Sequence, residues 1–332
     1  MSLYKSVFKD SLKLTWRNKY FWLLGLFTIF FSTSVEIDMF DNFFGPNRNN
    51  FYNYKTILEN GLVRGGFFNG LKNWLQTDPG SFYQMARLGL IFLLVLVALL
   101  LISAIAQIII TSHSASFIKL NVNNLKNPKK FGLLDNLKKM KGLIWPVSAT
   151  NLALKLLVNI ALILVSLPLL MNKAGAINWW YIILFILLFP AAIVLAFIAR
   201  YVTSYIIIQG QGFRRALANG WFLFKNNWLI SVEMSLMLFL LNIFGSLAVI
   251  FIILAIANPL WFIGIIVNQY VYKGGFYIVL AISYVLFFCL FAWGASLLSV
   301  FNITSWTGLF LKLDKSGGES KLMRLFSDLT NK

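Results

Sequence analysis

The segment from Phe8 to Trp22 reads FKDSLKLTWRNKYFW, and it recurs later in the chain as FRRALANGWFLFKNNW from Phe213 to Trp228. Both copies combine basic and apolar residues and run directly into a long apolar stretch. Three identical pairs carry the alignment of the two copies: Phe8 with Phe213, Leu12 with Leu217, and Trp16 with Trp221. The recurrence indicates one architectural unit that the chain uses more than once.

A third, weaker copy lies between them, from Leu133 to Trp145. It keeps Asp135, Leu137 and Lys138 at the places of Asp10, Leu12 and Lys13, but has Lys141 where the first copy has Trp16. The unit is therefore expected three times, each time as a lead-in to a membrane hairpin.

The spacing of residues within the first copy predicts an amphipathic helix. An apolar stripe of Phe8, Leu12 and Trp16 adjoins a basic stripe with the same spacing of four. The basic stripe consists of Lys5, Lys9, Lys13 and Arg17. A helix of this kind lies in the headgroup plane of a bilayer with its apolar side toward the hydrocarbon.

The composition is that of a polytopic membrane protein. Of 332 residues, 59% are hydrophobic, 17% aromatic and only 12% charged, which is too apolar for a soluble domain of this length. The net charge of +18 would suggest nucleic acid as the partner of a soluble protein. In a membrane protein the same charge is interpreted through its distribution, and no nucleic-acid partner is expected.

The apolar runs predict an all-α bundle of six transmembrane helices arranged in three hairpins. The predicted spans are 20–35, 86–112, 144–171, 179–208, 229–257 and 276–303. Three amphipathic lead-in segments precede the hairpins: 1–19, 113–143 and 209–228. The remaining large segments are an outer loop, 36–85, and a tail, 304–332. The first span is expected to be retained and not cleaved as a secretory signal.

The positions of Lys and Arg predict the orientation. The lead-in segments and the tail hold 20 of the 29 basic residues, whereas the segments on the opposite side hold 6. The other three, Arg87, Lys155 and Arg200, fall within spans. The positive-inside rule therefore places both termini and all lead-in segments in the cytoplasm.

The basic lead-in residues are candidates for binding lipid headgroups. The candidate set is Lys5, Lys9, Lys13, Arg17, Arg214 and Arg215. Each could gain about 1 kcal/mol near an anionic bilayer surface, so anionic lipids are the expected partners. The alternative is purely topological, in which these charges only fix the orientation of the chain.

Three ionisable residues form a candidate intramembrane cluster: Lys155, Arg200 and Glu233. A charge inside the bilayer is costly and tends to find a partner, so Glu233 is expected to pair with Lys155 or Arg200. A proton or substrate relay and unpaired snorkelling are the alternatives.

A polar stripe formed by Ser103, Gln107 and Thr111 is predicted on the second span. On the third span, Asn151, Lys155 and Asn159 have the same spacing of four. Such stripes either bond to neighbouring helices or line a cavity.

The sequence contains no recognisable catalytic or metal-binding motif. His113 is the only histidine and Cys289 the only cysteine, which excludes paired-histidine zinc motifs and intramolecular disulfides. No catalytic residue, metal or cofactor is therefore assigned.

The segment from Ser11 to Gly25, SLKLTWRNKYFWLLG, resembles the opening of uncharacterised six-span bacterial membrane proteins. The segment Phe213 to Trp228 resembles a repeat in the membrane domain attached to some glycerophosphodiester phosphodiesterases. The resemblance implies a bacterial cytoplasmic membrane location and an unassigned role. It does not imply phosphodiesterase activity, because the catalytic domain of those enzymes is missing from this sequence.

The sequence thus favours a non-enzymatic membrane module that organises lipids or proteins. A transporter or lipid-translocating protein is the alternative. A membrane-protein partner or a second copy of the chain stays open as an additional binding partner.

Overall fold

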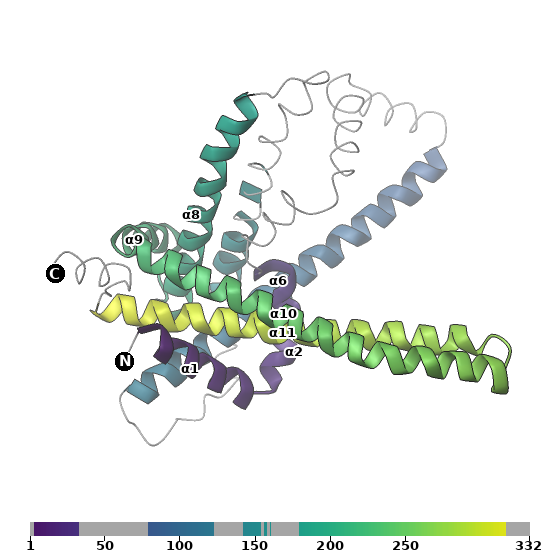
Figure 1. The fold of residues 1–332 in the computed structure, drawn as a ribbon. Helices are drawn as coiled ribbons and strands as arrows, with labels where there is room; N and C mark the ends of the chain where they lie inside the picture. Colours follow the sequence, from purple (N-terminus) through teal and green to yellow (C-terminus); the bar gives the residue numbers. More distant parts are fainter. Residues whose placement is uncertain are drawn as a thin grey trace.

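The computed structural model describes residues 3–32, 79–122, 142–153, 156–157, 160 and 179–316 (Figure 1). These residues are almost entirely helical, and none of them lies in a strand. The helices are α1 (Leu3–Arg17), α2 (Tyr20–Ser32), α6 (Pro79–Val122), α8 (Trp179–Gln209), α9 (Phe213–Asn226), α10 (Trp228–Ile266), the π-helical turn η2 (Val267–Val271) and α11 (Gly275–Ser316). A further helix covers 142–153. The all-helical prediction is confirmed.

Within the described ranges, four helices are long and apolar enough to cross a membrane. They cover Tyr83–Lys119, Ile186–Gln209, Trp228–Val271 and Gly275–Lys315, and a shorter apolar helix covers Tyr20–Ile29. Most of the predicted third span, 144–171, lies outside the described residues. Six spans and three hairpins therefore stay a prediction.

The helices extend past the limits that hydropathy suggested. α6 begins at Pro79, inside the predicted outer loop, because proline is well suited to the first turn of a helix. α10 continues past 257 to Ile266, and α11 continues past 303 to Ser316. The first extension runs through Pro259 and the second through Lys312, Asp314 and Lys315, so both helices continue past residues that mark a boundary in the sequence.

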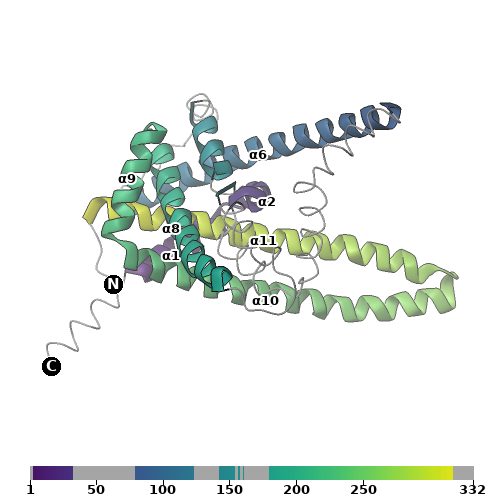
Figure 2. The same cartoon turned by 90° about the horizontal axis from the view of Figure 1, so that it is seen from above.

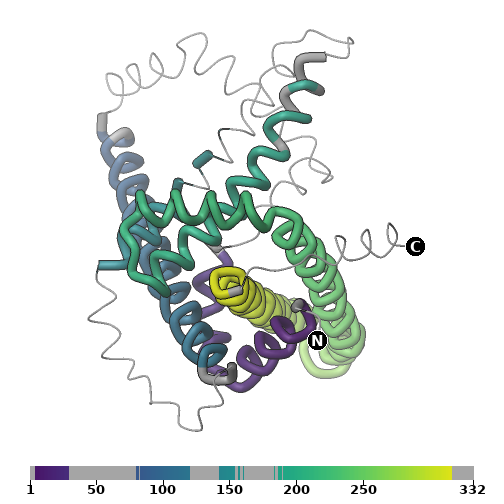
Figure 3. Tube along the Cα trace, turned by 90° about the vertical axis from the view of Figure 1, so that its left-hand side faces the viewer, coloured from purple at the N-terminus to yellow at the C-terminus, as the bar shows by residue number. Residues whose placement is uncertain are grey.

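α11 is the central helix of the fold. Viewed along its axis, it is surrounded by α1 and α2, α6, α8 with α9, and α10 (Figure 3). It contacts α10, α2, α1, α6 and α8, and the contact with α10 is the most extensive. α10 and α11 form an antiparallel hairpin that closes at Gly274, whose φ of 102° requires glycine.

The buried core occupies one end of the bundle, where α1 and α9 also lie (Figure 2). Its largest members come from five helices and include Tyr4 of α1, Ile108 of α6, Phe197 and Tyr201 of α8, Met234 of α10, and Leu309 and Phe310 of α11. Away from this core, α6, α8 and the α10–α11 hairpin diverge (Figure 1), and their apolar side chains are widely exposed. Exposed apolar surface on this scale is suited to contact with lipid.

Candidate functional site

The two best-matching lead-in segments form separate helices: Asn18 and Lys19 divide α1 from α2, and Asn227 alone divides α9 from α10. At Asn18, the backbone N–H and the side-chain amide both donate to the carbonyl of Leu14, each at 3.2 Å. At Asn227, the same two groups both donate to the carbonyl of Leu223, each at 3.1 Å. The chain therefore uses the same break twice, between α1 and α2 and between α9 and α10.

The breaks do not fall at aligned sequence positions. The alignment that pairs Phe8 with Phe213 also pairs Asn18 with Leu223, whereas the second break lies at Asn227, one helical turn further on. The second copy thus contains an additional turn before the break.

The two helices nevertheless bury equivalent faces. Ser11 and Thr15 of α1 are buried, as are their aligned partners Ala216 and Gly220 of α9. On the opposite face Leu12 and Trp16 are 63% and 65% exposed, and the aligned Leu217 and Trp221 are 45% and 51% exposed. At these aligned positions small residues face the bundle and large apolar residues face outward, and the buried faces also contain larger side chains such as Tyr4, Leu14 and Phe224.

The predicted headgroup residues lie on this outward surface. All six are exposed: Lys5, Lys9, Lys13, Arg17, Arg214 and Arg215. Trp16 lies against Trp22 with ring centroids 5.7 Å apart, and Trp22 lies against Trp293 at 5.5 Å. Basic and aromatic side chains on one surface are typical of a helix in the headgroup region.

Polar contacts and one ring pair fasten α1 to the bundle. The hydroxyl of Tyr4 donates to Oε2 of Glu233 on α10, and Nζ of Lys312 on α11 donates to Oγ of Ser6. Phe8 stacks on Phe301 of α11 at 6.0 Å. The inner face of α1 is thus held by specific side-chain partners as well as by apolar burial.

Close backbone packing fastens α9 to α8. A Cβ at Gly220 would lie 3.0 Å from Cγ2 of Val202 and 3.2 Å from its backbone nitrogen. Phe224 stacks on Phe197 of α8 at 5.7 Å. Because glycine has no side chain, α9 can lie directly on α8 at this point.

A chain of amide groups fixes the connection between α8 and α9. Asp314 of α11 accepts hydrogen bonds from the hydroxyl of Tyr205 at 3.3 Å and from Nε2 of Gln209 at 2.9 Å. Gln209 in turn accepts from Gln211 at 2.7 Å, and Gln211 accepts from Asn219 of α9 at 2.8 Å. The network joins the ends of α8 and α11 to the first half of α9.

The structure places the members of the predicted intramembrane cluster as follows. Glu233 is buried and accepts the bond from Tyr4. The guanidinium of Arg200 lies over the ring of Trp306, 4.5 Å from its centroid, a cation–π contact. Lys155 lies outside the described residues, and the pairing of Glu233 with either cation stays a prediction.

The two predicted polar stripes meet at one point. Nδ2 of Asn151 donates to Oε1 of Gln107 at 2.7 Å, which joins the helix 142–153 to α6. Ser103 and Thr111 are buried on either side of Gln107. Within the part of the chain that the structure describes, the hydroxyl of Ser103 has no hydrogen-bond partner.

Several residues that organise this region were not predicted as site residues: Tyr4, Ser6, Lys312, Asp314 and Tyr205. A pattern in the sequence could have indicated Tyr4, since Tyr4, Val7, Ser11 and Leu14 recur at helical spacing opposite the basic stripe. Lys312 and Asp314 were assigned to a cytoplasmic tail, and nothing local in the sequence indicates their partners.

His113 packs against aromatic rings. Its Nδ1 lies 3.4 Å from the hydroxyl of Tyr20, and its ring meets that of Phe21 edge to face at 5.2 Å. Among the described residues, no three His, Cys, Asp or Glu side chains gather as they would around a metal ion.

Comparisons with known protein families, with curated proteins and with solved structures found no match.

Proposed function

We propose that this chain is an integral protein of a bacterial cytoplasmic membrane that gathers anionic lipids at the inner interface through α1 and α9. Both termini lie in the cytoplasm in this proposal, and the chain crosses the bilayer six times. The four long apolar helices of the described part are compatible with membrane insertion.

The outward position of Leu12, Trp16, Leu217 and Trp221 is the observation that carries the proposal. Two helices, far apart in sequence, present the same apolar and aromatic positions to the outside and bury the same small ones. In water this arrangement would expose costly apolar surface on both helices. At a bilayer interface the same side chains are buried in the headgroup and upper acyl region, and the neighbouring cations face lipid phosphates.

The fixed placement of the helices supports a role beyond topology. Basic residues that only set orientation need no defined geometry, because the positive-inside rule depends on charge number and location. Here α1 is bonded to α10 and α11, and α9 is held by Gly220 and by the network at Asp314. The basic side chains of each helix are therefore presented as a defined surface.

The proposal is tested by replacing Arg214 and Arg215 with Gln and comparing this variant with a matched variant, Lys119→Gln with Lys315→Gln. The control removes two exposed cations from the ends of α6 and α11, at the same end of the bundle. Native mass spectrometry of protein titrated with phosphatidylglycerol or phosphatidylcholine counts the lipids retained.

We expect the α9 variant to lose retained phosphatidylglycerol, the control variant to keep it, and phosphatidylcholine to be unchanged in both. A fourfold variant of α1, with Lys5, Lys9, Lys13 and Arg17 replaced by Gln, should lose anionic lipid in the same way. Equal lipid retention in all variants would leave only the topological role for these cations.

A second candidate is a transporter or lipid-translocating protein. The buried Ser103 hydroxyl and the Gln107–Asn151 pair favour it, because polar groups inside a span are often part of a pathway. Reconstituted protein should then move labelled lipid between leaflets, and Glu233→Gln should abolish the movement. Absence of translocation by the unmodified protein would eliminate this candidate.

A further inference from the structure

The last parts of α6 and α11 resemble one another in sequence. A shift of 193 positions (296 minus 103) aligns SAIAQIIITSHSASFIKL at 103–120 with SLLSVFNITSWTGLFLKL at 296–313. Seven of these eighteen aligned residues are identical, and the longest identical run is Ile-Thr-Ser, which begins at Ile110 in α6 and at Ile303 in α11. The chain therefore repeats in these helices as well as in the lead-in segments.

A shorter copy lies in α8. It reads VTSY from Val202 to Tyr205, where α6 has ITSH and α11 has ITSW. The threonine of every copy is buried: Thr111, Thr203 and Thr304. The three helices α6, α8 and α11 thus occupy corresponding places in three like units.

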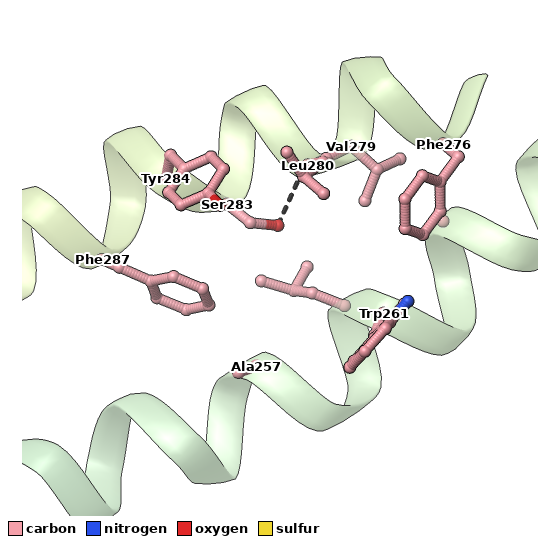
Figure 4. A pocket seen from close by; sticks show the side chains of 10 residues that line it. Ala257, Trp261, Phe276, Val279, Leu280, Ser283, Tyr284 and Phe287 are labelled. Carbon is pink, nitrogen blue, oxygen red and sulfur yellow. Dashed lines mark hydrogen bonds between the residues drawn. The ribbon is translucent and has the colours of Figure 1, made fainter. Parts of the chain in front are cut away.

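Each unit consists of a lead-in segment, a first helix and a second helix. The N-terminal unit contains α1, α2 and α6, and the C-terminal unit contains α9, α10 and α11. Of the middle unit, the structure describes the helix 142–153 and α8. In the C-terminal unit, α10 and α11 lie side by side, and near their turn they enclose an apolar pocket of about 260 Å³ that is lined by this unit alone (Figure 4).

A buried or partly buried side-chain hydrogen bond joins the second helix of one unit to the first helix of the next. Between the N-terminal and middle units, Nδ2 of Asn151 donates to Oε1 of Gln107 on α6 at 2.7 Å. Between the middle and C-terminal units, the hydroxyls of Tyr201 on α8 and Ser231 on α10 lie 2.7 Å apart. The units therefore contact one another by the same rule at both junctions.

The last unit follows this rule with the first one. No further unit follows α11 in the described part of the chain, and α11 contacts α2, the first helix of the N-terminal unit. Here the hydroxyls of Ser299 on α11 and Thr28 on α2 lie 2.8 Å apart, and both residues are buried. The series of units thus returns to its start.

The lead-in helices obey the same order. α9 lies on α8, the second helix of the preceding unit, where Gly220 meets Val202. α1 lies on α11, the second helix of the last unit, where a Cβ at Gly308 would lie 3.2 Å from Cγ1 of Val7. The glycine belongs to the lead-in helix in the first contact and to the second helix in the other. Corresponding places in the two junctions explain why α1 and α9 bury corresponding faces.

We propose that the chain is a closed ring of three like units, in which the second helix of each unit is the docking surface for the next unit. The partner that docks on α11 is the N-terminal unit of the same chain. The ring does not depend on lipid binding, so its test is separate from that of the function proposed above.

Circular permutation tests the ring, because a closed ring tolerates a new starting point between units. The chain is opened between Asn127 and Pro128, and residues 317–332 then link α11 to α1. Nζ of Lys312 donates to Oγ of Ser6, so the two helix ends to be joined lie side by side. The order of units becomes middle, C-terminal, N-terminal, and no unit is interrupted.

Disulfide formation reports whether the N-terminal unit docks in the permuted chain. In a Cys289→Ser background, Val7→Cys is combined with Gly308→Cys, because a Cβ at Gly308 would lie 3.9 Å from Cβ of Val7. The control combines Gly264→Cys with Val279→Cys inside the C-terminal unit, where the same distance is 3.6 Å. Both distances suit a disulfide.

We expect the permuted chain to be monomeric and to form both disulfides to the same extent as the chain in its native order. Formation of the control disulfide without the one between positions 7 and 308 would overturn the proposal. A disulfide between positions 7 and 308 of two different chains would identify a second copy as the partner of α11 and also overturn it.

A second test decides the matter if the permuted chain does not fold. A protease site inserted after Asn127 allows the folded chain to be cut between the N-terminal and middle units, and gel filtration in mild detergent then shows whether the two pieces stay together. Gly25→Ala weakens the closing contact, since its Cβ would lie 2.6 Å from the carbonyl oxygen of Ser296 on α11. Gly89→Ala of α6 is the control, because its Cβ meets nothing within 4 Å.

We expect the pieces to elute together after cutting of the unmodified chain and of Gly89→Ala, and to separate in Gly25→Ala. Separation in the unmodified chain would overturn the ring. Equal retention in all three proteins would also overturn it, because closure would then not depend on the contact of α2 with α11.

Discussion

The hydroxyl of Tyr4 donates a hydrogen bond to Oε2 of Glu233, which joins the first helix of the chain to α10 across 229 positions of sequence. Tyr4 is 2% and Glu233 8% exposed, so both groups would lose their water on packing. A buried carboxylate needs donors, and α1 supplies one of them. The position of α1, and with it the direction of its basic stripe, is thus coupled to an acidic residue inside the bundle.

Replacing Tyr4 with Phe should destabilise the protein by about 1.5–3 kcal/mol, the usual contribution of a hydrogen bond to a charged group. The ring remains, but the carboxylate of Glu233 loses a donor. The change is measured as the shift in unfolding in mild detergent, together with the rate of tryptic cleavage at the exposed Lys5 and Lys9. Cleavage should accelerate because α1 opens more often.

Tyr20→Phe is the control for this variant. Tyr20 is 45% exposed and its hydroxyl lies 3.4 Å from His113, at the long end of the hydrogen-bonding range. Its loss should change stability by no more than about 0.5 kcal/mol. Equal shifts in the two variants would contradict a special role for the Tyr4–Glu233 bond.

Gly220→Ala should loosen the contact between α9 and α8. The new Cβ would lie 3.0 Å from Cγ2 of Val202 and 3.4 Å from the carbonyl oxygen of Ile198, so the side chain of Val202 or the packed backbones must shift by a few tenths of an ångström. Overpacking of this kind costs about 1–3 kcal/mol. Thermal unfolding measures the loss, and the fluorescence of the exposed Trp221 reports movement of α9.

The matched control for Gly220→Ala is Gly89→Ala in α6. A Cβ at Gly89 meets nothing within 4 Å, so the same substitution should be neutral or stabilise the helix by up to about 1 kcal/mol. If both variants behave alike, the close approach of α9 and α8 is not important for stability.

The lead-in helices could be predicted from the sequence because their pattern is local. Apolar and basic residues recur every four positions in α1, and the alignment of Leu12 with Leu217 and of Trp16 with Trp221 identifies the face that both helices turn outward. The second break, at Asn227, could not be placed in this way. The additional helical turn in α9 moves the break by four residues, but it leaves the spacing of apolar residues along the helix unchanged.

Long-range partners could not be predicted. The sequence suggested cationic partners for Glu233. The structure adds Tyr4, from the first turn of α1, and no pattern in the sequence links Tyr4 to Glu233 of α10. The charges of Lys312 and Asp314 suggested the end of the membrane segment. In the structure α11 continues through them, because Lys312 reaches Ser6 and Asp314 accepts bonds from α8.

Substitutions at Asp314 should loosen the start of α9 in a graded way. The carboxylate accepts two bonds on different oxygens, so Asp314→Asn retains one acceptor and Asp314→Ala retains none. Hydrogen exchange of the amides from 210 to 220 should increase slightly in the first variant and more in the second. Lys315→Ala, one residue away and exposed, should leave the exchange unchanged, and an equal increase there would contradict a specific effect of the network.

The bond between Gln107 and Asn151 should appear as a coupling energy in a double-mutant cycle. The variants are Gln107→Leu, Asn151→Leu and their combination, each measured by unfolding in detergent. Hydrogen bonds between membrane helices contribute about 0.6 kcal/mol on average and up to about 1.7 kcal/mol. The double variant should therefore lose less stability than the sum of the two single variants, by an amount in this range.

A control cycle of Gln107→Leu with Asn242→Leu of α10 should be additive within about 0.5 kcal/mol. Additivity in the first cycle would mean that the two polar stripes act separately, and the Gln107–Asn151 pair could then no longer favour a pathway through the bundle.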